Sequence, residues 1–292
     1  MSTSISKEKA MSKKNPSDKI YDLICRASCE IPEDVRTALE RAYRKEADAS
    51  PARQQLELIL KNIKMAERLG QPLCQDTGAI TFYVSAPNNF DRTAFRKSAE
   101  LAIIQATNEG ILRKNSVCPI TGRNDGTNVG PGSPMIYWSE KASKRLEMKL
   151  LLKGGGSENI GAQYSLPDDK LGAGRDLDGV RKCVLDAVFK AQGKGCPPSI
   201  ISVCIGGDRA SGYSECKKQF FRKLSERNRD QVISKLEKRL LADINSLGIG
   251  AMGLGGKTTA LDVFVTALNR VPASYFVTVS QMCWACRRAE SR

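Results

Sequence analysis

The sequence predicts a mixed α/β fold organised as one large domain. Segments with a helical spacing of apolar residues alternate along the chain with short runs that have the pattern of strands. The chain has 292 residues, enough to bury a large core, and a globular composition with 41% hydrophobic and 27% charged residues. We find no internal repeat, and no low-complexity linker beyond the N-terminal tail.

The first 17 residues are predicted to be a flexible polar tail, followed by a folded domain over residues 18–292. The start, MSTSISKEKAMSKKNPSDK, lacks the apolar centre of a secretory signal. No apolar run approaches the length of a membrane span. We therefore expect a cytoplasmic protein that does not enter membranes.

Three helices are predicted before the first strand. The first covers residues 18–29, the second starts at Pro32, and the third runs from Pro51 to a stop at Gly70. Proline and the acids that follow Pro32 suit a first helical turn, where the helix dipole favours negative charge. Apolar residues of the third helix keep a helical spacing: Leu56, Ile59, Leu60, Ile63 and Ala66.

The loop Pro72-Leu73-Cys74-Gln75-Asp76-Thr77-Gly78 precedes an alternating strand over residues 79–85. It places a thiol, which is a soft metal ligand, next to an amide, a carboxylate and a hydroxyl. Its glycine permits a tight turn. The loop is a candidate site, but a helix-to-strand connector with a buried free cysteine explains it equally well.

The middle of the chain contains two loops of unusual composition. Residues 110–134 form a polar loop of a length that is usually functional or disordered. In Lys153-Gly154-Gly155-Gly156-Ser157-Glu158-Asn159, three glycines let the backbone approach a ligand or another chain, although a plain turn is the alternative. Around them we predict helices over 93–109 and 177–192, and strands over 135–139, 145–152 and 200–205.

The chain carries a net charge of +14, and residues 217–239 hold nine Lys or Arg against three Asp or Glu. This stretch lies in a helix or helix pair predicted over residues 213–247. Such charge can indicate a nucleic-acid partner or an anionic substrate. No helix-turn-helix, RNP or zinc-finger pattern accompanies it, so we expect no nucleic acid and favour a solvated helix face that attracts small anions.

Residues 250–259 contain Gly-Lys-Thr but are not predicted to bind nucleotide phosphates. The P-loop spacing needs a glycine where this chain has Ala251, and the segment follows a helix rather than a strand. A last strand is predicted over residues 274–279. Cys283 and Cys286 then form a C-x-x-C pair.

The chain has no histidine and ten cysteines. The lack of histidine excludes Ser-His-Asp chemistry and His-ligated zinc within this chain. Its acid–base groups would be carboxylates, hydroxyls, lysines, water or metal-bound species, or would come from another chain. Ten cysteines without a secretion signal argue against a disulfide framework.

Three cysteines lie at loop edges beside glycine, proline or polar residues: Cys74, Cys196 and Cys283. Widely spaced single cysteines suit an iron–sulfur cluster held by the tertiary fold. Three thiolates on a four-iron cluster leave one iron open to act as a Lewis acid. The alternative is ten scattered structural thiols, which is our expectation for Cys118, Cys204 and Cys286.

Six motifs follow one another along the chain: Pro72–Gly78, Lys153–Asn159, Gly195–Pro198, Ile205–Arg209, Gly250–Val263 and Cys283–Arg288. Together they resemble the α subunit of class I, iron–sulfur fumarate hydratases, a family that includes the L-tartrate dehydratase α subunit. The resemblance covers nearly all of the chain from about residue 18. It implies a single large α-type hydro-lyase domain.

The resemblance implies an oxygen-sensitive [4Fe-4S] cluster with Cys74, Cys196 and Cys283 as its ligands. It also implies reversible hydration of fumarate to (S)-malate, with the open iron as the Lewis acid. Family substrate contacts fall on Gln75 and Asp76, which we expect to be catalytic, and on Arg113, Gly154, Gly155 and Gly156. A guanidinium such as that of Arg113 suits a carboxylate because it pairs bidentately.

The family is completed by a β subunit, or by a C-terminal domain in single-chain forms, which this chain is expected to lack. We therefore expect activity only in an αβ assembly, with (αβ)₂ as the favoured form. Fumarate is favoured because residues 252–259 look closer to the fumarase version of that loop. The alternatives are an L-tartrate dehydratase or methylfumarate hydratase α subunit, or a catalytically silent basic binding protein.

One position departs from the family. Its members commonly carry a histidine twelve residues before the last cluster cysteine, where it contacts substrate, and this chain has Val271 there. Loss of a hydrogen bond to a carboxylate would cost about 1.5–3 kcal/mol unless another group, such as Arg270, replaces it. We expect Val271 to lower activity or to change substrate preference.

Overall fold

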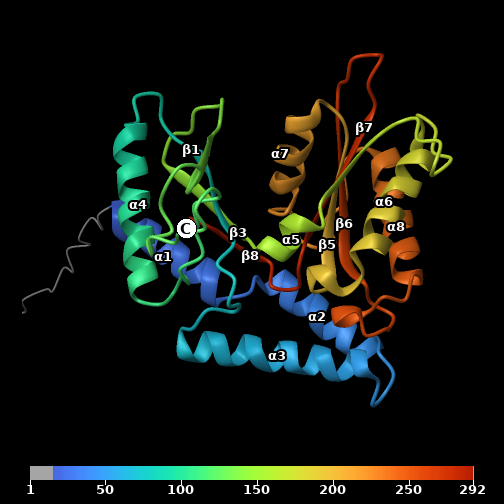
Figure 1. Cartoon of the computed structure of the whole chain (residues 1–292), viewed down its shortest axis with the longest axis horizontal. Coiled ribbons are helices and arrows are strands. Elements are labelled where there is room, and N and C mark those ends of the chain that lie inside the picture. The colour runs from blue at the N-terminus through green and yellow to red at the C-terminus, as the bar shows by residue number, and fades with distance from the viewer. Residues whose placement is uncertain (1–15, 292) are drawn as a thin grey trace, which may run out of the picture.

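The computed structural model describes residues 16–291, which form two four-stranded sheets side by side above two helices (Figure 1). The predicted mixed α/β class is confirmed. Residues 1–15 of the predicted tail lie outside the described part. Pro16 and Ser17 already belong to the first helix, so this helix starts two residues earlier than expected.

Helices and strands alternate along much of the chain. The helices are α1 (Pro16–Cys29), α2 (Glu33–Lys45), α3 (Pro51–Leu69), α4 (Arg92–Asn108), α5 (Gly155–Asn159), α6 (Leu177–Ala191), α7 (Arg209–Gln219) and α8 (Gln231–Ser246). The strands are β1 (Ala79–Ser85), β2 (Met135–Trp138), β3 (Glu147–Lys153), β4 (Ala162–Ser165), β5 (Ser199–Gly206), β6 (Ala260–Leu268), β7 (Phe276–Met282) and β8 (Arg287–Glu290). Two short 3₁₀ helices are η1 (Gln192–Gly195) and η2 (Ala251–Gly253).

Local sequence sets the two ends of α3. The Ser50 hydroxyl accepts a hydrogen bond from the Arg53 backbone N–H at 3.2 Å, and Pro51 occupies the first turn, where its missing N–H costs nothing. Gly70 ends the helix in a left-handed conformation with φ 60°. Both ends agree with the prediction, and the helix leads directly into the loop that carries Cys74.

The first sheet has the strand order β2-β1-β3-β8. β3 pairs antiparallel with both β1 and β8, and β2 runs parallel to β1. α1 and α4 cover one face, where Ile24, Phe82 and Ile103 are fully buried. This half of the molecule thus combines the N-terminal helices with β8, which is the last strand along the chain.

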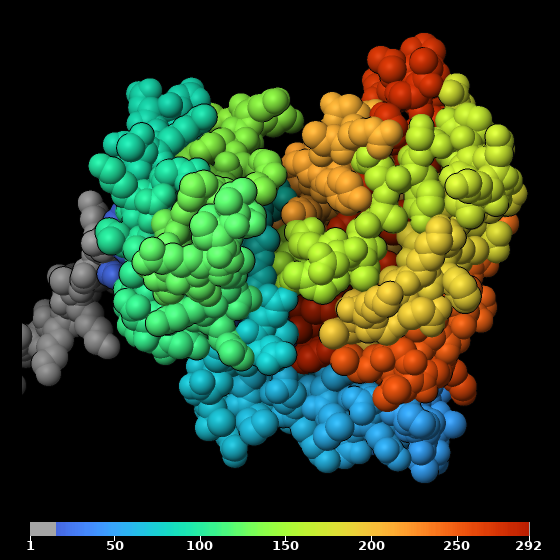
Figure 2. All heavy atoms as spheres, in the orientation of Figure 1, coloured from blue at the N-terminus to red at the C-terminus, as the bar shows by residue number. Residues whose placement is uncertain are grey.

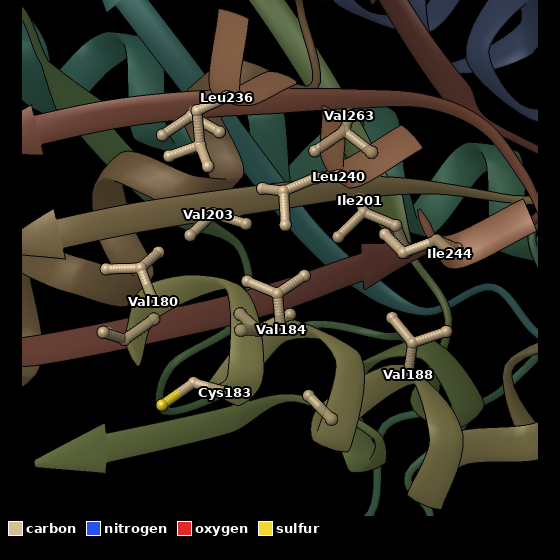
Figure 3. Close-up of a cluster of buried hydrophobic side chains, with 14 of the residues drawn as sticks. Val180, Cys183, Val184, Val188, Ile201, Val203, Leu236, Leu240, Ile244 and Val263 are labelled. Atoms are coloured by element: carbon tan, nitrogen blue, oxygen red, sulfur yellow. The ribbon is translucent and has the colours of Figure 1, made fainter. Parts of the chain in front are cut away.

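The second sheet has the order β4-β7-β5-β6, with α6 and α8 on one face and α7 on the other. Figure 3 shows the apolar layer under α6 and α8. In it, Val184 and Leu240 pack against Ile201 and Val203 of β5, and all four are at most 1% exposed. β5 is buried over its whole length, as expected for a strand that is covered on both faces.

α2 and α3 lie beneath both sheets and join them through a third apolar cluster. Leu56 of α3 packs in this cluster with Leu151 of the first sheet and Phe264 of the second. Among residues 16–291, no helix has both the length and the hydropathy needed to cross a bilayer.

The path of the chain between strands passes from one sheet to the other twice. The first crossing runs from β3 through Lys153–Asn159, which includes α5, to β4. The second runs from β7 through Cys283–Cys286 to β8. We call these two crossings the seam, and Figure 1 shows α5 between the two halves.

The sequence patterns did not predict four of the elements: α5, β4, β6 and β8. The basic segment forms the helix pair α7 and α8, as expected, with residues 220–230 between the two helices. The segment after residue 259 continues as strand β6 and not as a helix, which agrees with the exclusion of a P-loop.

Candidate active site

Three loop-edge cysteines approach one another at the seam. Cys74 lies between α3 and β1, Cys196 directly follows η1, and Cys283 directly follows β7. All three are half-buried free thiols. Burial raises the pKa of the Cys196 thiol, and Cys283 and Cys74 raise it further. The three side chains are therefore within electrostatic range of one another.

Figure 2 shows the seam as a hollow between the two halves of the molecule. Dark red atoms of the β7–β8 crossing are visible at its floor. Around them lie the cyan Cys74 loop, the yellow-green α5 and the yellow segment that precedes β5. Segments that are far apart in the sequence thus share one concave region.

Hydrogen bonds to backbone groups hold the three cysteine segments. Cys196 adopts a left-handed conformation with φ 52°, and its carbonyl accepts a hydrogen bond from Trp284 N at 3.2 Å. Cys283 N donates to the Ser157 hydroxyl at 3.3 Å. The Cys74 loop is fixed where Asn62 Nδ2 donates to the Leu73 carbonyl at 3.0 Å. The β7–β8 crossing is therefore tied to the Cys196 segment and to α5.

The three cysteines provide a donor set of the kind that holds an iron–sulfur cluster. Within the described residues, no group of three or more Cys, Asp or Glu side chains is close enough to bind one ion. The ligands of a four-iron cluster bind different iron atoms and so need not converge on a point. Three half-buried thiols without a disulfide provide the soft ligands that iron–sulfur clusters use.

The Asp76 carboxylate connects the Cys74 loop to the seam. Its Oδ2 accepts a hydrogen bond from Gly155 N at 2.6 Å, and its Oδ1 accepts from Gly78 N and Asn115 Nδ2, both at 2.8 Å. A Cβ on Gly154 would lie 2.8 Å from Asp76 Oδ2, so glycine allows this close approach. Asp76 and the glycine loop, which the sequence singles out separately, are direct partners.

Arg113 and Gln75 are exposed, and both belong to segments that contact this network. The Arg113 carbonyl accepts hydrogen bonds from Thr77 Oγ1 and from Asn128 Nδ2, each at 2.7 Å. Asn128 is 2% exposed and also accepts from the backbone of residues 115 and 116. A buried asparagine therefore organises the long polar loop that carries Arg113.

A cavity of about 300 Å³ opens beside Asp76. Its lining includes Asn115, Lys153, Gly155 and Glu158. Lys153 Nζ donates to the Ser157 carbonyl at 2.7 Å and to Glu158 Oε2 at 3.1 Å. This volume is at the lower end of the range for small-molecule sites, which suits a small polar ligand.

Glu158 lies between two lysines, Lys153 of β3 and Lys217 of α7, whose Nζ is 2.5 Å from Glu158 Oε1. Burial opposes ionisation of Glu158, but the two lysines outweigh it and lower its pKa. Burial lowers the pKa of Lys153 against the attraction of Glu158. The sequence patterns assigned no role to these three residues, although Lys153 and Glu158 flank the glycine run.

Arg287 is a further residue that the sequence analysis missed. It is 1% exposed and donates a hydrogen bond to the Asp76 carbonyl. In the sequence, the feature that could have marked Arg287 is its position directly after the C-x-x-C pair of Cys283 and Cys286.

Val271 lies away from these groups. It is 65% exposed in the loop between β6 and β7. β7 runs from this end of the second sheet to Cys283 at the other, and seven residues of strand span roughly 20 Å. The structure does not bring Val271 to the candidate site, because the β6–β7 connection that carries it lies at the opposite end of β7 from Cys283.

The basic segment and the Gly-Lys-Thr loop serve the fold. Arg222 Nη1 lies 2.8 Å from Glu237 Oε1, and Arg227 Nη1 lies 2.7 Å from Asp262 Oδ1. Both carboxylates are buried. At the loop, the N–H groups of Lys257 and Thr258 donate to the Glu46 carboxylate at 2.9–3.0 Å, so the chain supplies its own anion there.

Comparison with known proteins places the chain in a family. A Geobacillus stearothermophilus protein named as a class I fumarate hydratase is 44% identical over 274 residues, which are 93% of this chain and 53% of that protein. The chain thus spans about half the length of that relative. A Methanocaldococcus jannaschii protein named as an L(+)-tartrate dehydratase subunit alpha is 41% identical over 282 residues, 94% of this chain and 96% of that protein.

An Escherichia coli L(+)-tartrate dehydratase subunit alpha is 29% identical over 268 residues, 91% of this chain and 86% of that protein. The family model described as fumarate hydratase (fumerase) matches residues 17–292. The expected resemblance is confirmed: this chain belongs to the fumarate hydratase (fumerase) family.

Proposed function

We propose that this chain is the cluster-bearing α part of an iron–sulfur hydro-lyase that hydrates fumarate reversibly to (S)-malate. The observation that carries the proposal is the approach of Cys74, Cys196 and Cys283 at the seam, beside the Asp76 carboxylate. The family membership and the names of the relatives support a hydro-lyase.

The three cysteines would hold a [4Fe-4S] cluster as thiolates. When bound, such a cluster with only three protein ligands supplies a Lewis acid for oxygen atoms of the substrate. The half-buried position of the thiols allows a small molecule to reach the site. In this proposal, no side chain of this chain acts as the Lewis acid.

The residues around the cysteines would bind and orient a dicarboxylate. Arg113, exposed on its loop, would pair with one carboxylate through its planar guanidinium. Gly154, Gly155 and Gly156 would bring backbone N–H groups close to the other. Gln75 would donate from its amide, next to Cys74.

Asp76 would be the acid–base group on this side of the substrate. Its carboxylate is held by three N–H donors, so it has a defined orientation toward the cavity. A carboxylate in this role is consistent with a chain that contains no histidine.

A β-type partner would complete the enzyme, as an αβ pair or an (αβ)₂ assembly. Two relatives carry names of α subunits, and the Geobacillus relative is about twice as long as the segment it shares with this chain. The same names keep L-tartrate and methyl-substituted fumarates as alternative substrates. A silent basic binding protein is the weaker alternative, because carboxylates pair with much of the basic segment.

The first test is anaerobic purification followed by iron and sulfide analysis. We expect a brown wild-type chain that carries a cluster, and a Cys74→Ser variant that loses it. Cys118→Ser is the matched control, since Cys118 is an exposed thiol in the polar loop and is not one of the three proposed ligands. A wild-type chain that takes up no iron under these conditions would refute the proposal.

The second test is a hydration assay of the chain with and without its β-type partner, on fumarate, mesaconate and L-tartrate. We expect activity only with the partner and the highest rate on fumarate. Full activity of the isolated chain would refute the need for a partner, and a preference for another substrate would replace fumarate in the proposal.

A further inference from the structure

Arg287, the first residue of β8, is a buried cation without a carboxylate partner. Its side chain is 1% exposed, and its Nε–H has no hydrogen-bond partner among the described residues. Its Nη1 donates to the Asp76 backbone carbonyl. The structure contains two other buried cations, Lys153 and Arg288, within residues 16–291. Lys153 pairs with Glu158 and Arg288 pairs with Asp34.

This difference has an energetic consequence. Desolvating an ionised side chain costs several kcal/mol unless opposite charge and hydrogen bonds offset the cost. In the described part of the chain, no carboxylate oxygen lies within 4.0 Å of the Arg287 guanidinium. A further negative charge close to the guanidinium would offset part of this cost.

The surroundings of Arg287 indicate where that charge would come from. Arg287 is four residues after Cys283, and its bond to the Asp76 carbonyl places it two residues from Cys74. Its Nη2 also lies 3.4 Å from the point where a Cβ on Gly154 would be. The guanidinium therefore stands between two candidate cluster-ligand segments and the glycine loop.

We propose that Arg287 is the buried counter-charge of the thiolates that hold the cluster, and a positioning residue for the Cys74 loop. The inference rests on the proposed function. Iron-bound sulfur ligands are thiolates, so a bound cluster would add negative charge beside Arg287 to that of the nearby Asp76 carboxylate. The unpartnered Nε–H is then available to a sulfur acceptor, and hydrogen bonds to sulfur tune the reduction potential of such clusters.

The proposal separates Arg287 from its neighbour Arg288, which is also buried but is paired with Asp34. In the metal-free chain, Arg287→Met removes a buried charge that has no carboxylate in direct contact, so we expect an unchanged or higher melting temperature. Arg288→Met leaves Asp34 unpaired, so we expect the melting temperature to fall by roughly 5–15 °C. The metal-free chain is measured with each variant under reducing conditions.

In the cluster-loaded chain, Arg287→Met should have the larger effect and Arg288→Met the smaller one, measured as cluster retention. We expect Arg287→Met to weaken cluster retention roughly 10–100-fold, as loss of a group that supports metal ligands does. Removal of positive charge disfavours the more negative reduced state, so the remaining cluster should have a more negative reduction potential. Arg287→Lys should restore most of the iron content and the potential, and folded Arg288→Met should retain iron like the wild type.

Each outcome decides between the two proposals. Wild-type chain without iron would sink both. Wild-type and Arg287→Met chains with equal iron content and equal potential would overturn the role of Arg287 alone. A metal-free Arg287→Met chain as unstable as Arg288→Met, or an Arg287→Lys chain that rescues nothing, would show that Arg287 is an ordinary structural residue.

Discussion

Two glycine-rich loops of this molecule each bind a carboxylate from a distant part of the chain. At the seam, Gly155 N donates to Asp76. At the loop before β6, Lys257 N and Thr258 N donate to Glu46. The local chemistry is the same, since in both cases backbone N–H groups replace the water that a carboxylate would otherwise bind.

The two carboxylates differ in what surrounds them. Glu46 is 4% exposed, and the donors to its carboxylate are backbone groups, so the loop is closed around it. Asp76 also lines a cavity and shares its oxygens with the Asn115 side chain. A glycine-rich loop thus indicates an anion nearby, but only the surroundings show whether that anion belongs to the fold or to a site.

Asp76→Asn should show the difference between the two carboxylates most strongly. The amide keeps the shape of the side chain but removes its charge and its ability to accept a proton. We expect turnover of the partnered enzyme to fall about 10²–10⁴-fold, with a loss of about 1.5–3 kcal/mol in the free energy of unfolding, because the new amide NH₂ faces an N–H donor. Steady-state kinetics and urea denaturation of the same preparation measure both. A turnover within threefold of the wild type would rule out the acid–base role.

Gly78→Ala tests how tightly the seam is built. Gly78 has φ +77°, and a Cβ there would lie 2.4 Å from the Lys153 carbonyl oxygen. We expect a loss of about 2–4 kcal/mol in the free energy of unfolding, from backbone strain and the clash.

Gly255→Ala is the control for this strain. Gly255 has φ +80° but no atom within 4 Å of its Cβ position, so it should lose only about 1–2 kcal/mol. Equal losses from chemical denaturation would show that the close packing at Gly78 has no energetic weight.

Glu46→Gln is the counterpart of Asp76→Asn. The side chain keeps its shape, and hydrogen bonds to a charged acceptor become hydrogen bonds to a neutral one. We expect a loss of about 1.5–3 kcal/mol in the free energy of unfolding, measured with urea. Activity per folded molecule should stay at the wild-type value, and a specific loss of turnover would contradict the assignment of Glu46 to the fold.

Glu158→Gln should change stability in a way that depends on pH. Burial opposes the ionisation of Glu158, but Lys153 and Lys217 outweigh it and lower the pKa of Glu158 from its ordinary value of 4.5. A carboxylate with a lowered pKa in the folded state stabilises above its unfolded pKa and loses this contribution as pH falls through its folded pKa. The wild type should therefore be more stable than the variant at pH 7, and the gap should close below about pH 4.5.

Denaturation of the metal-free chain at several pH values measures this gap. Glu40→Gln is a suitable control, because Glu40 is a more exposed partner in a surface pair with Arg44. A gap that stays constant down to acid pH would mean that the two lysines do not stabilise the charge of Glu158.

The helices were predictable from sequence because their signals are local. Ser50 and Gly70 fix the ends of α3 through bonds within a few residues of each. Strands that depend on distant partners were not. β6 contains Asp262, which reads as a break in an apolar run, yet it is buried because Ser225 N and Arg227 bind it. β8 begins with two arginines, which are buried by partners elsewhere in the fold.

The candidate site follows the same division. Cys74, Cys196 and Cys283 could be singled out by their neighbours in sequence, and the family motifs assigned them one role. That Asp76 binds Gly155, that Glu158 lies between two lysines, and that Arg287 is buried are results of tertiary packing. α5 could not be foreseen because glycine is a poor helix former, and its first turn depends on the carboxylate bound at Gly155.

The second crossing of the seam also sets the order in which the protein can be completed during synthesis. β8 lies in the first sheet, but the ribosome makes it after every other strand of both sheets. A nascent chain ending before residue 283 already has Cys74 and Cys196 but neither Cys283 nor Arg287. The third thiol and its neighbouring positive charge therefore arrive together, after the rest of the framework has been translated.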